Sequence, residues 1–194
     1  MINGYDFDKT IYDGDCTVDF FIYMNLTRPY LLLFFPWYLI LFICYGLKIV
    51  GKKRFKELLF FFVPWHKKNI NKIVDKFWSK NANKIKDWYS LQKTNEDIIV
   101  SASLKFIIEP IANHFKVGCL IATDYDVNTG KISGCNCYGE HKVVKFKAIY
   151  GDLKLSAFYS DSLSDAPMMR LSEKSYLVDK NKITDITEQI NSQK

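Results

Sequence analysis

The sequence lacks the features that mark three common classes of protein. Its five cysteines form an odd set without zinc-type CxxC spacing, so free thiols in a reducing cytoplasm are the simplest interpretation. A metal site built from Cys135, Cys137 and His141 would depend on a CNC spacing that is wrong for structural zinc. The first ten residues have neither a basic nor an apolar segment, so no cleavable signal is expected. Arginine is scarce, with three in 194 residues, and no nucleic-acid-binding motif is present, which argues against a nucleic-acid-binding module.

The composition is that of a folded globular protein, with 48% hydrophobic and 25% charged residues. A chain of this length holds one domain, or one domain with a sizeable insertion. The net charge of +6 is uneven, because residues 51–90 contain eleven Lys or Arg and three acidic residues, a local charge of +8. This asymmetry indicates an anionic partner for that segment, whether lipid, phosphate or nucleic acid.

Strands and helices are predicted to alternate after residue 93. The expected order is a strand over 97–103, a helix over 104–115, a strand from 119 entering a hairpin near 128–131, a helix over 139–149, a strand over 154–161, a helix over 164–172 and a strand over 175–178. Residues 1–8 are expected to supply one more strand. Such alternation predicts a parallel sheet covered by helices on both faces.

Residues 17–92 are predicted to be helical and to interrupt the sheet as an insertion. From residue 70, apolar residues fall at helical spacing (Ile70, Ile73, Val74, Phe77, Trp78, Ile85 and Trp88). Lysines recur every four residues from Lys68 to Lys84, forming either a solvated face or an anion-facing surface. We therefore predict an α/β core from residues 1–13 and 93–194, with an all-helical insertion over 14–92.

An uncharged run over residues 30–47 reaches the length threshold for a membrane span. A single span would place residues 1–28 and 95–194 on opposite sides of a bilayer, although both are expected to share one sheet. The next apolar run, residues 58–65, is too short to return across about 30 Å of hydrocarbon. A buried helical hairpin or a shallow, one-sided contact with an anionic membrane remains.

The stretch YDFDKT places two carboxylates, Asp6 and Asp8, at the carboxyl end of the first predicted strand. Residues i and i+2 of an extended segment point to the same side, so these carboxylates can converge. Ser101, Asp161 and Asp165 lie at the carboxyl ends of other predicted strands, which is where ligands bind in open α/β sheets. Hard oxygen ligands with little sulfur favour Mg²⁺.

These segments resemble the motifs of the haloacid dehalogenase superfamily, subfamily IB, which includes phosphoserine phosphatases. The first motif, DxDxT, corresponds to Asp6 through Thr10, and the second, apolar residues followed by Ser or Thr, to residues 98–101. The third, a lysine that opens a helix, corresponds to Lys142. The fourth, (G)DxxxD, corresponds to residues 161–165, with Ser160 in place of the usual glycine. The resemblance implies a Rossmann-like core, with the helical insertion acting as a cap.

The resemblance also implies a role for each residue. Asp6 would be the nucleophile that forms an aspartyl-phosphate, and Asp8 the general acid and base. Ser101 and Lys142 would contact the transferred phosphate. Thr10, Asp15, Ala102 and Ser103 would line the substrate site. The side chains of Asp6 and Asp161 and the backbone carbonyl of Asp8 would hold Mg²⁺, while Asp165 would orient Lys142 or a metal-bound water.

The substrate stays open at this point. In phosphoserine phosphatases a glutamate after the first motif reads the amino group, and Asp15 stands at the matching position. The apolar and cationic insertion instead resembles that of membrane-associated phosphatidylglycerophosphate phosphatases. The alternatives are a Mg²⁺-dependent phosphatase of a lipid phosphate, a phosphatase of a small metabolite such as phosphoserine, and a non-catalytic anion- or nucleic-acid-binding module. A cytoplasmic location is expected, at the inner face of the membrane for a lipid substrate; the sequence predicts no oligomeric state.

Overall fold

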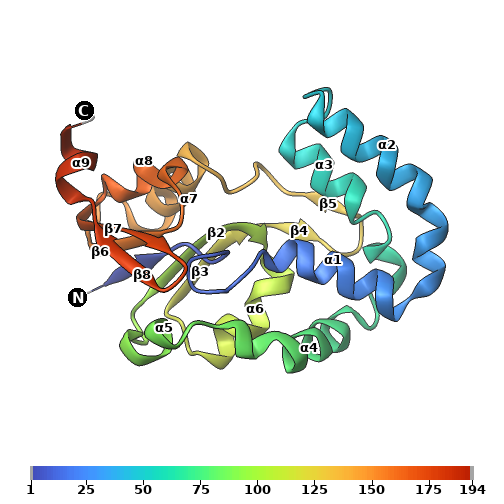
Figure 1. The fold of residues 1–194 in the computed structure, drawn as a ribbon, viewed down its shortest axis with the longest axis horizontal. Coiled ribbons are helices and arrows are strands. Elements are labelled where there is room, and N and C mark those ends of the chain that lie inside the picture. Colours follow the sequence, from blue (N-terminus) through green and yellow to red (C-terminus); the bar gives the residue numbers. More distant parts are fainter. Residues whose placement is uncertain (1, 193–194) are drawn as a thin grey trace.

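The computed structural model describes residues 2–192 and contains a six-stranded sheet in the order β3-β2-β1-β6-β7-β8 (Figure 1). Adjacent strands run parallel except β8, which pairs antiparallel with β7. The strands are β1 (Asn3–Tyr5), β2 (Ile98–Leu104), β3 (Cys119–Thr123), β6 (Leu155–Ser160), β7 (Ser172–Asp179) and β8 (Lys182–Asp185). The predicted α/β fold with a Rossmann-like parallel sheet is confirmed.

Helices cover both faces of the sheet. Neighbouring residues of a strand point to opposite faces, and in β2 the side chains of Ile98 and Val100 belong to one apolar cluster while that of Ile99 belongs to the other. The first cluster includes side chains of α7 (Glu140–Tyr150), α8 (Ala166–Met169) and α9 (Thr187–Ser192), and the second includes those of α6 (Lys105–His114). The sheet is therefore buried on both faces, as the continuous apolar run in β2 predicts.

Between β1 and β2 the chain forms helices, turns and two isolated β-bridges. These helices lie to the right of the sheet and below it in Figure 1. The α-helices are α1 (Cys16–Thr27), α2 (Phe35–Gly46), α3 (Lys52–Leu59), α4 (Ile70–Asn81) and α5 (Asp87–Gln92), and the 3₁₀ turns are Pro29–Phe34, Val63–His66 and Ala82–Lys84. The predicted helical content of this insertion is confirmed, while the exact domain division stays a prediction.

The helix predicted from residue 70 ends earlier than its apolar pattern suggests. Its first five apolar residues are buried along α4, but Ile85 lies beyond the helix and forms a bridge with Tyr12. The 3₁₀ turn Ala82–Lys84 redirects the chain towards the loop after β1. There the backbone N–H of Asp13 donates to the carbonyl of Lys84 at 2.8 Å. Backbone pairing of residues 84 and 85 with the loop after β1 therefore ends the helix before its apolar pattern does.

The apolar run over residues 30–47 is exposed, which excludes a buried hairpin for it. Among the described residues, Pro29–Gly46 is the one helical stretch whose length and composition would suffice to cross a membrane, and 17% of it is buried. Leu33 is 81% exposed and Phe35 is 62% exposed. The second apolar run does pack into the core, through Leu59, Phe60, Phe62 and Val63.

The C-terminal part departs from the predicted elements. The predicted helix over 164–172 is a 3₁₀ turn, Leu163–Asp165, followed by the short α8, and β7 is longer than predicted. The hairpin between β7 and β8 was not predicted. Its turn places Lys180 at φ 55°, a left-handed conformation that glycine or asparagine would have signalled in the sequence.

Gly4 lets β1 pack against the core at the strand that leads into Asp6. A Cβ at this position would lie 2.7 Å from Cδ1 of Leu155 and 2.7 Å from Cδ2 of Phe158, both fully buried. We expect Gly4→Ala to lower the free energy of unfolding by about 1–3 kcal/mol through overpacking, measured by chemical denaturation. Gly46→Ala is the control, because a Cβ there meets nothing within 4 Å; it should leave stability unchanged or raise it by up to about 1 kcal/mol. Equal stability of the two variants would contradict the proposed close approach.

Candidate active site

The predicted motif residues gather at the carboxyl end of the sheet, around a pocket of about 240 Å³. It is lined by Asp6, Asp8, Lys9, Asp15, Ala102, Tyr138, Lys142, Asp161, Ser162, Ser164 and Asp165. Asp6 continues from β1, and its backbone N–H donates to the carbonyl of Tyr159 in β6 at 2.8 Å. Five carboxylates and two lysines therefore face one small space.

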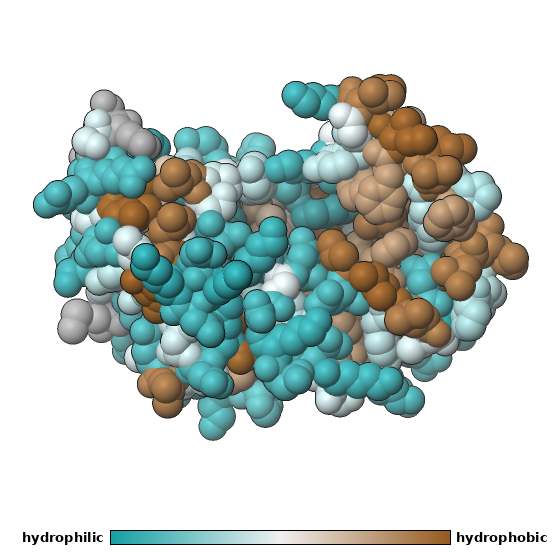
Figure 2. Space-filling view, viewed as in Figure 1, coloured by the Kyte–Doolittle hydropathy of each residue, from teal (hydrophilic) through white to brown (hydrophobic). Residues whose placement is uncertain are grey.

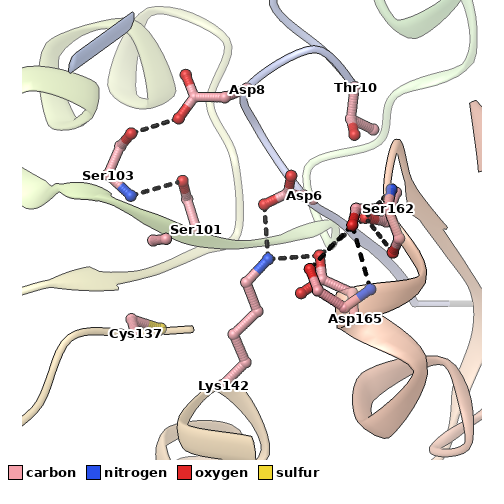
Figure 3. Close-up of polar contacts among 12 residues, drawn as sticks. Asp6, Asp8, Thr10, Ser101, Ser103, Cys137, Lys142, Ser162 and Asp165 are labelled. Atoms are coloured by element: carbon pink, nitrogen blue, oxygen red, sulfur yellow. Dashed lines mark hydrogen bonds and ion pairs between the residues drawn. The ribbon is translucent and has the colours of Figure 1, made fainter. Parts of the chain in front are cut away.

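Lys142 lies at the centre of this cluster (Figure 3). Its Nζ is 2.6 Å from Oδ1 of Asp6 and 2.6 Å from Oδ2 of Asp165. The side chain is 2% exposed, so both contacts are shielded from solvent. Ser160 Oγ also donates to Oδ2 of Asp165 at 2.8 Å. The ammonium thus joins β1, α7 and the turn after β6.

The five carboxylates of the pocket outnumber its two lysines. Burial raises the pKa of Asp6 to about 7, with Asp165 and Asp8 adding to the rise, even though Lys142 opposes it. Burial also raises the pKa of Asp161. The neighbouring Asp6 and Asp165 raise the pKa of Lys142 despite its burial, so its amine stays charged. The pocket therefore holds an excess of negative charge that a further cation would relieve.

Asp8 is held from the side opposite Lys142 (Figure 3). Its Oδ1 accepts the backbone N–H of Cys16 at 2.7 Å, and its Oδ2 accepts a hydrogen bond from Oγ of Ser103. Burial and then the charge of Asp15 raise the pKa of Asp8 to about 6, although these hydrogen bonds lower it. Asp8 is therefore fixed in place yet can carry a proton near neutral pH.

Three predicted site residues lie behind the pocket wall. Thr10 is fully buried, and its hydroxyl accepts a hydrogen bond from the backbone N–H of Asp161 at 2.8 Å. It therefore connects the loops after β1 and β6. Thr10 was predicted to line the substrate site, but it is not among the residues that line the pocket. Ser101 Oγ accepts the N–H of Ser103 at 3.1 Å. Ser103 is 3% exposed and contacts Asp8, so it too acts from behind.

Asp15 has a structural task as well as a place in the pocket. Its Oδ1 accepts the backbone N–H of Val18 at 3.0 Å and caps the start of α1. Gly14, at φ 148°, and Lys9, at φ 58°, shape the loop that carries it, and Lys9 N–H donates to the carbonyl of Gly14 at 2.8 Å. This tight loop returns Asp15 towards Asp8.

Lys56 of α3 contacts the wall of the pocket, a position that the sequence did not reveal. Its Nζ donates to the carbonyl of Ala102 at 2.6 Å and to Oδ1 of Asn136 at 2.8 Å. Burial lowers the pKa of its amine, against the charges of Asp8 and Asp15. One lysine in a lysine-rich segment gives no sequence signal, because only the folding of the insertion brings Lys56 to Ala102 and Asn136.

The donor set fits a hard divalent cation. Among residues 2–192, no group of three His, Cys, Asp or Glu side chains is close enough together to hold a metal ion. The ammonium of Lys142 lies between the carboxylates of Asp6 and Asp165. Asp6, Asp8 and Asp161 nevertheless bring carboxylates and backbone oxygens to one negatively charged pocket. Such oxygen ligands match Mg²⁺.

The chain is similar in sequence or in fold to several known proteins. In Caulobacter vibrioides, protein CicA is 32% identical over 92 residues, which cover 44% of this chain and 41% of that protein, less than half its length. A crystal structure of a protein of unknown function from Bordetella pertussis has a TM-score of 0.76 at 20% identity, covering 90% of this chain and 87% of that one. A phosphoserine phosphohydrolase-like protein from Francisella tularensis has a TM-score of 0.54 at 13% identity, covering 98% and 91%.

The family profile of haloacid dehalogenase-like hydrolases matches residues 4–170, which include every motif described above. The predictions of the superfamily and of an enzyme are therefore confirmed, while subfamily IB and the individual residue roles stay predictions. The chain belongs to the haloacid dehalogenase-like hydrolases.

Proposed function

We propose that this chain is a Mg²⁺-dependent phosphatase that cleaves phosphate monoesters through an aspartyl-phosphate on Asp6. The observation that carries the proposal is the placement of Asp6, which is buried, bonded to Lys142 and two residues from a second carboxylate in the same pocket. The bond to Lys142 engages Oδ1 of Asp6. The other oxygen of this carboxylate is assigned to the attack.

In the first step the carboxylate of Asp6 attacks phosphorus, and the bond from phosphorus to the ester oxygen breaks. Asp8 gives its proton to that leaving oxygen. In the second step Asp8 takes a proton from water, whose oxygen attacks the phosphorus and releases inorganic phosphate and free Asp6. The raised pKa of Asp8, about 6, supports its role as a proton donor near neutral pH.

The reaction brings the negatively charged carboxylate of Asp6 close to a negatively charged phosphate. At about 4 Å, each pair of like unit charges raises the energy by about 4 kcal/mol at an effective dielectric of about 20. Lys142 offsets part of this repulsion and holds the Asp6 carboxylate in one orientation. Asp6, Asp161 and the backbone carbonyl of Asp8 would hold Mg²⁺, which supplies further positive charge when bound. Asp165 is assigned to positioning Lys142.

Replacing the nucleophile tests the reaction. Asp6→Asn keeps the size of the side chain and removes its negative charge, so turnover of p-nitrophenyl phosphate should fall by about a thousandfold or more. Acid quenching during turnover of ³²P-labelled substrate should trap labelled protein for the unmodified chain and none for Asp6→Asn. EDTA should stop turnover, and added Mg²⁺ should restore it.

Asp13→Asn is the matched control, because Asp13 belongs to the same loop and is exposed. It should keep turnover within about threefold of the unmodified chain, since surface substitutions have small effects. Unchanged turnover in Asp6→Asn would overturn the mechanism.

We further propose that the substrate is a lipid phosphate reached by peripheral contact of the helical insertion, acting as a cap, with an anionic membrane. Support comes from an exposed apolar face over α1, the 3₁₀ turn after it and α2, visible as brown surface in the right half of Figure 2. We define this apolar face by Val18, Ile22, Leu26, Leu32, Leu33, Phe35, Trp37, Leu39, Ile40, Phe42, Ile43, Leu47 and Ile49. Contiguous apolar surface of this extent indicates a partner.

Charge complementarity favours an anionic bilayer as that partner. No acidic residue occurs between Asp19 and Glu57, a stretch that spans the whole of α2. Exposed Lys48, Lys52 and Lys53 follow the apolar helix. An apolar face with basic flanks is typical of helices that lie in the membrane interface. Each basic residue near an anionic surface contributes about 1 kcal/mol to binding. On this proposal the protein works at the cytoplasmic face of the membrane.

Vesicle flotation tests the contact. The triple variant Leu33→Glu, Phe35→Glu, Ile40→Glu places three charges on the apolar face, and we expect its binding to phosphatidylglycerol-containing vesicles to fall at least about tenfold. The control triple Leu91→Glu, Val144→Glu, Ile149→Glu adds the same charge at exposed apolar sites elsewhere and should still bind.

Binding of the unmodified chain should weaken at high salt and be absent with neutral phosphatidylcholine alone. Equal flotation of both triple variants would contradict a specific face. Faster turnover of phosphoserine than of any lipid phosphate would favour the small-metabolite alternative. The presence of Asp15 in the pocket supports that alternative.

A further inference from the structure

A second cavity of about 540 Å³ adjoins the catalytic pocket. One wall is the start of α3, from Gly51 to Glu57, and the other is the segment over residues 134–141. Tyr138 lines both spaces, so the two cavities share a wall. None of the catalytic carboxylates lines the second cavity.

The charge of this cavity is opposite to that of the catalytic pocket. Lys52, Lys53 and Arg54 line it with a single carboxylate, Glu57. Glu57 is already engaged, because it accepts the backbone N–H of Ile132 at 3.0 Å and pairs with Arg54 at 3.1 Å. The neighbouring catalytic pocket contains five carboxylates and two lysines.

The two lysines of the second cavity, Lys52 and Lys53, contact neutral groups and no carboxylate. Lys52 Nζ is 3.2 Å from the centroid of the Tyr138 ring, and Lys53 Nζ donates to the carbonyl of Gly134. Within residues 2–192, neither amine forms an ion pair with a carboxylate. A cation held on an aromatic ring or a single carbonyl gains more from a charged acceptor, because charge-assisted hydrogen bonds are stronger.

Lys56 stands at the boundary between the two cavities. It donates to the carbonyl of Ala102, which lines the catalytic pocket, and to Oδ1 of Asn136, which lines the second cavity. Lys52 and Lys56 lie four residues apart on α3 and therefore on one side of this helix. Cations thus continue from the second cavity to the edge of the catalytic pocket.

We propose that the second cavity binds a second anionic group of the substrate, a phosphate or phosphodiester, while the catalytic pocket binds the phosphate that is cleaved. This inference rests on the proposed phosphatase function and narrows its substrate to molecules with two anionic groups. Lys52 and Lys53 are the assigned specificity residues. The rim of the cavity at Gly51 follows directly on Leu47 and Ile49 of the apolar face, so an amphiphile on that face would bring its polar end to this cavity.

Binding measurements on the full chain with Mg²⁺ test the second site without requiring turnover. The probes are alkane-α,ω-bisphosphonates of two to six carbons, each compared with the alkylphosphonate of the same length by calorimetry. We expect the best bisphosphonate to bind at least about tenfold more tightly than its partner, as one charge-assisted contact provides. In Lys52→Ala, Lys53→Ala this ratio should fall below about threefold.

The control is Lys68→Ala, Lys72→Ala, which removes the same charge from exposed positions of the insertion that line neither cavity. It should keep the tenfold ratio. The matching diol bisphosphates and hydroxyalkyl phosphates, used as substrates, should show the same ratio in kcat/KM. A ratio near one at every length, or one that survives in Lys52→Ala, Lys53→Ala, would overturn the second site. Tight bisphosphonate binding with no turnover of any phosphate ester would instead contradict the phosphatase proposal.

Discussion

The buried ion cluster of Lys142 with Asp6 and Asp165 is the constraint on which the rest of the structure depends. Charges taken out of water are costly unless their partners are held in good geometry. Three separate elements must therefore be placed to within a hydrogen-bond length of one another, although Asp6 and Lys142 are 136 residues apart in sequence. The parallel sheet does this by aligning the ends of β1 and β6, and α7 delivers the lysine. The hydroxyl of Thr10 ties the loops after β1 and β6 together through its bond to the backbone of Asp161.

The molecule also separates its charges. Carboxylates concentrate at the edge of the sheet, while cations concentrate in the insertion, and the overall charge of +6 conceals this division. The division has a chemical use for a phosphatase, because the cleaved phosphate requires cations at the carboxylates, whereas an attached anionic group requires cations further away. Lys56 connects the two regions through its bonds to Ala102 and Asn136.

The sequence predicted the strands, helices and motifs that depend on local or periodic patterns. It did not predict contacts between residues far apart in the chain. The alternation of strands and helices after residue 93 follows from apolar runs, and the motifs around Asp6 and Asp161 mark the ends of β1 and β6. Thr10 was expected in the substrate space, but its hydroxyl bonds the backbone of Asp161, a partner 151 residues away. The hairpin at Lys180 was missed because its turn carries no glycine. The exposure of α2 was undecided, because composition alone does not reveal which helices find a partner.

The exposure of α2 and the cationic cavity support one another when considered together. An exposed apolar helix by itself fits many partners, and a cationic cavity by itself fits many anions. Here the apolar helix ends at Gly46 and the cavity begins at Gly51, so the two surfaces are joined by a few residues. A molecule that used both would need an apolar part, an anionic group and a phosphate monoester in that order. This order follows from the arrangement of α2, α3 and the sheet edge, and it is met by a phospholipid whose head group ends in a phosphate.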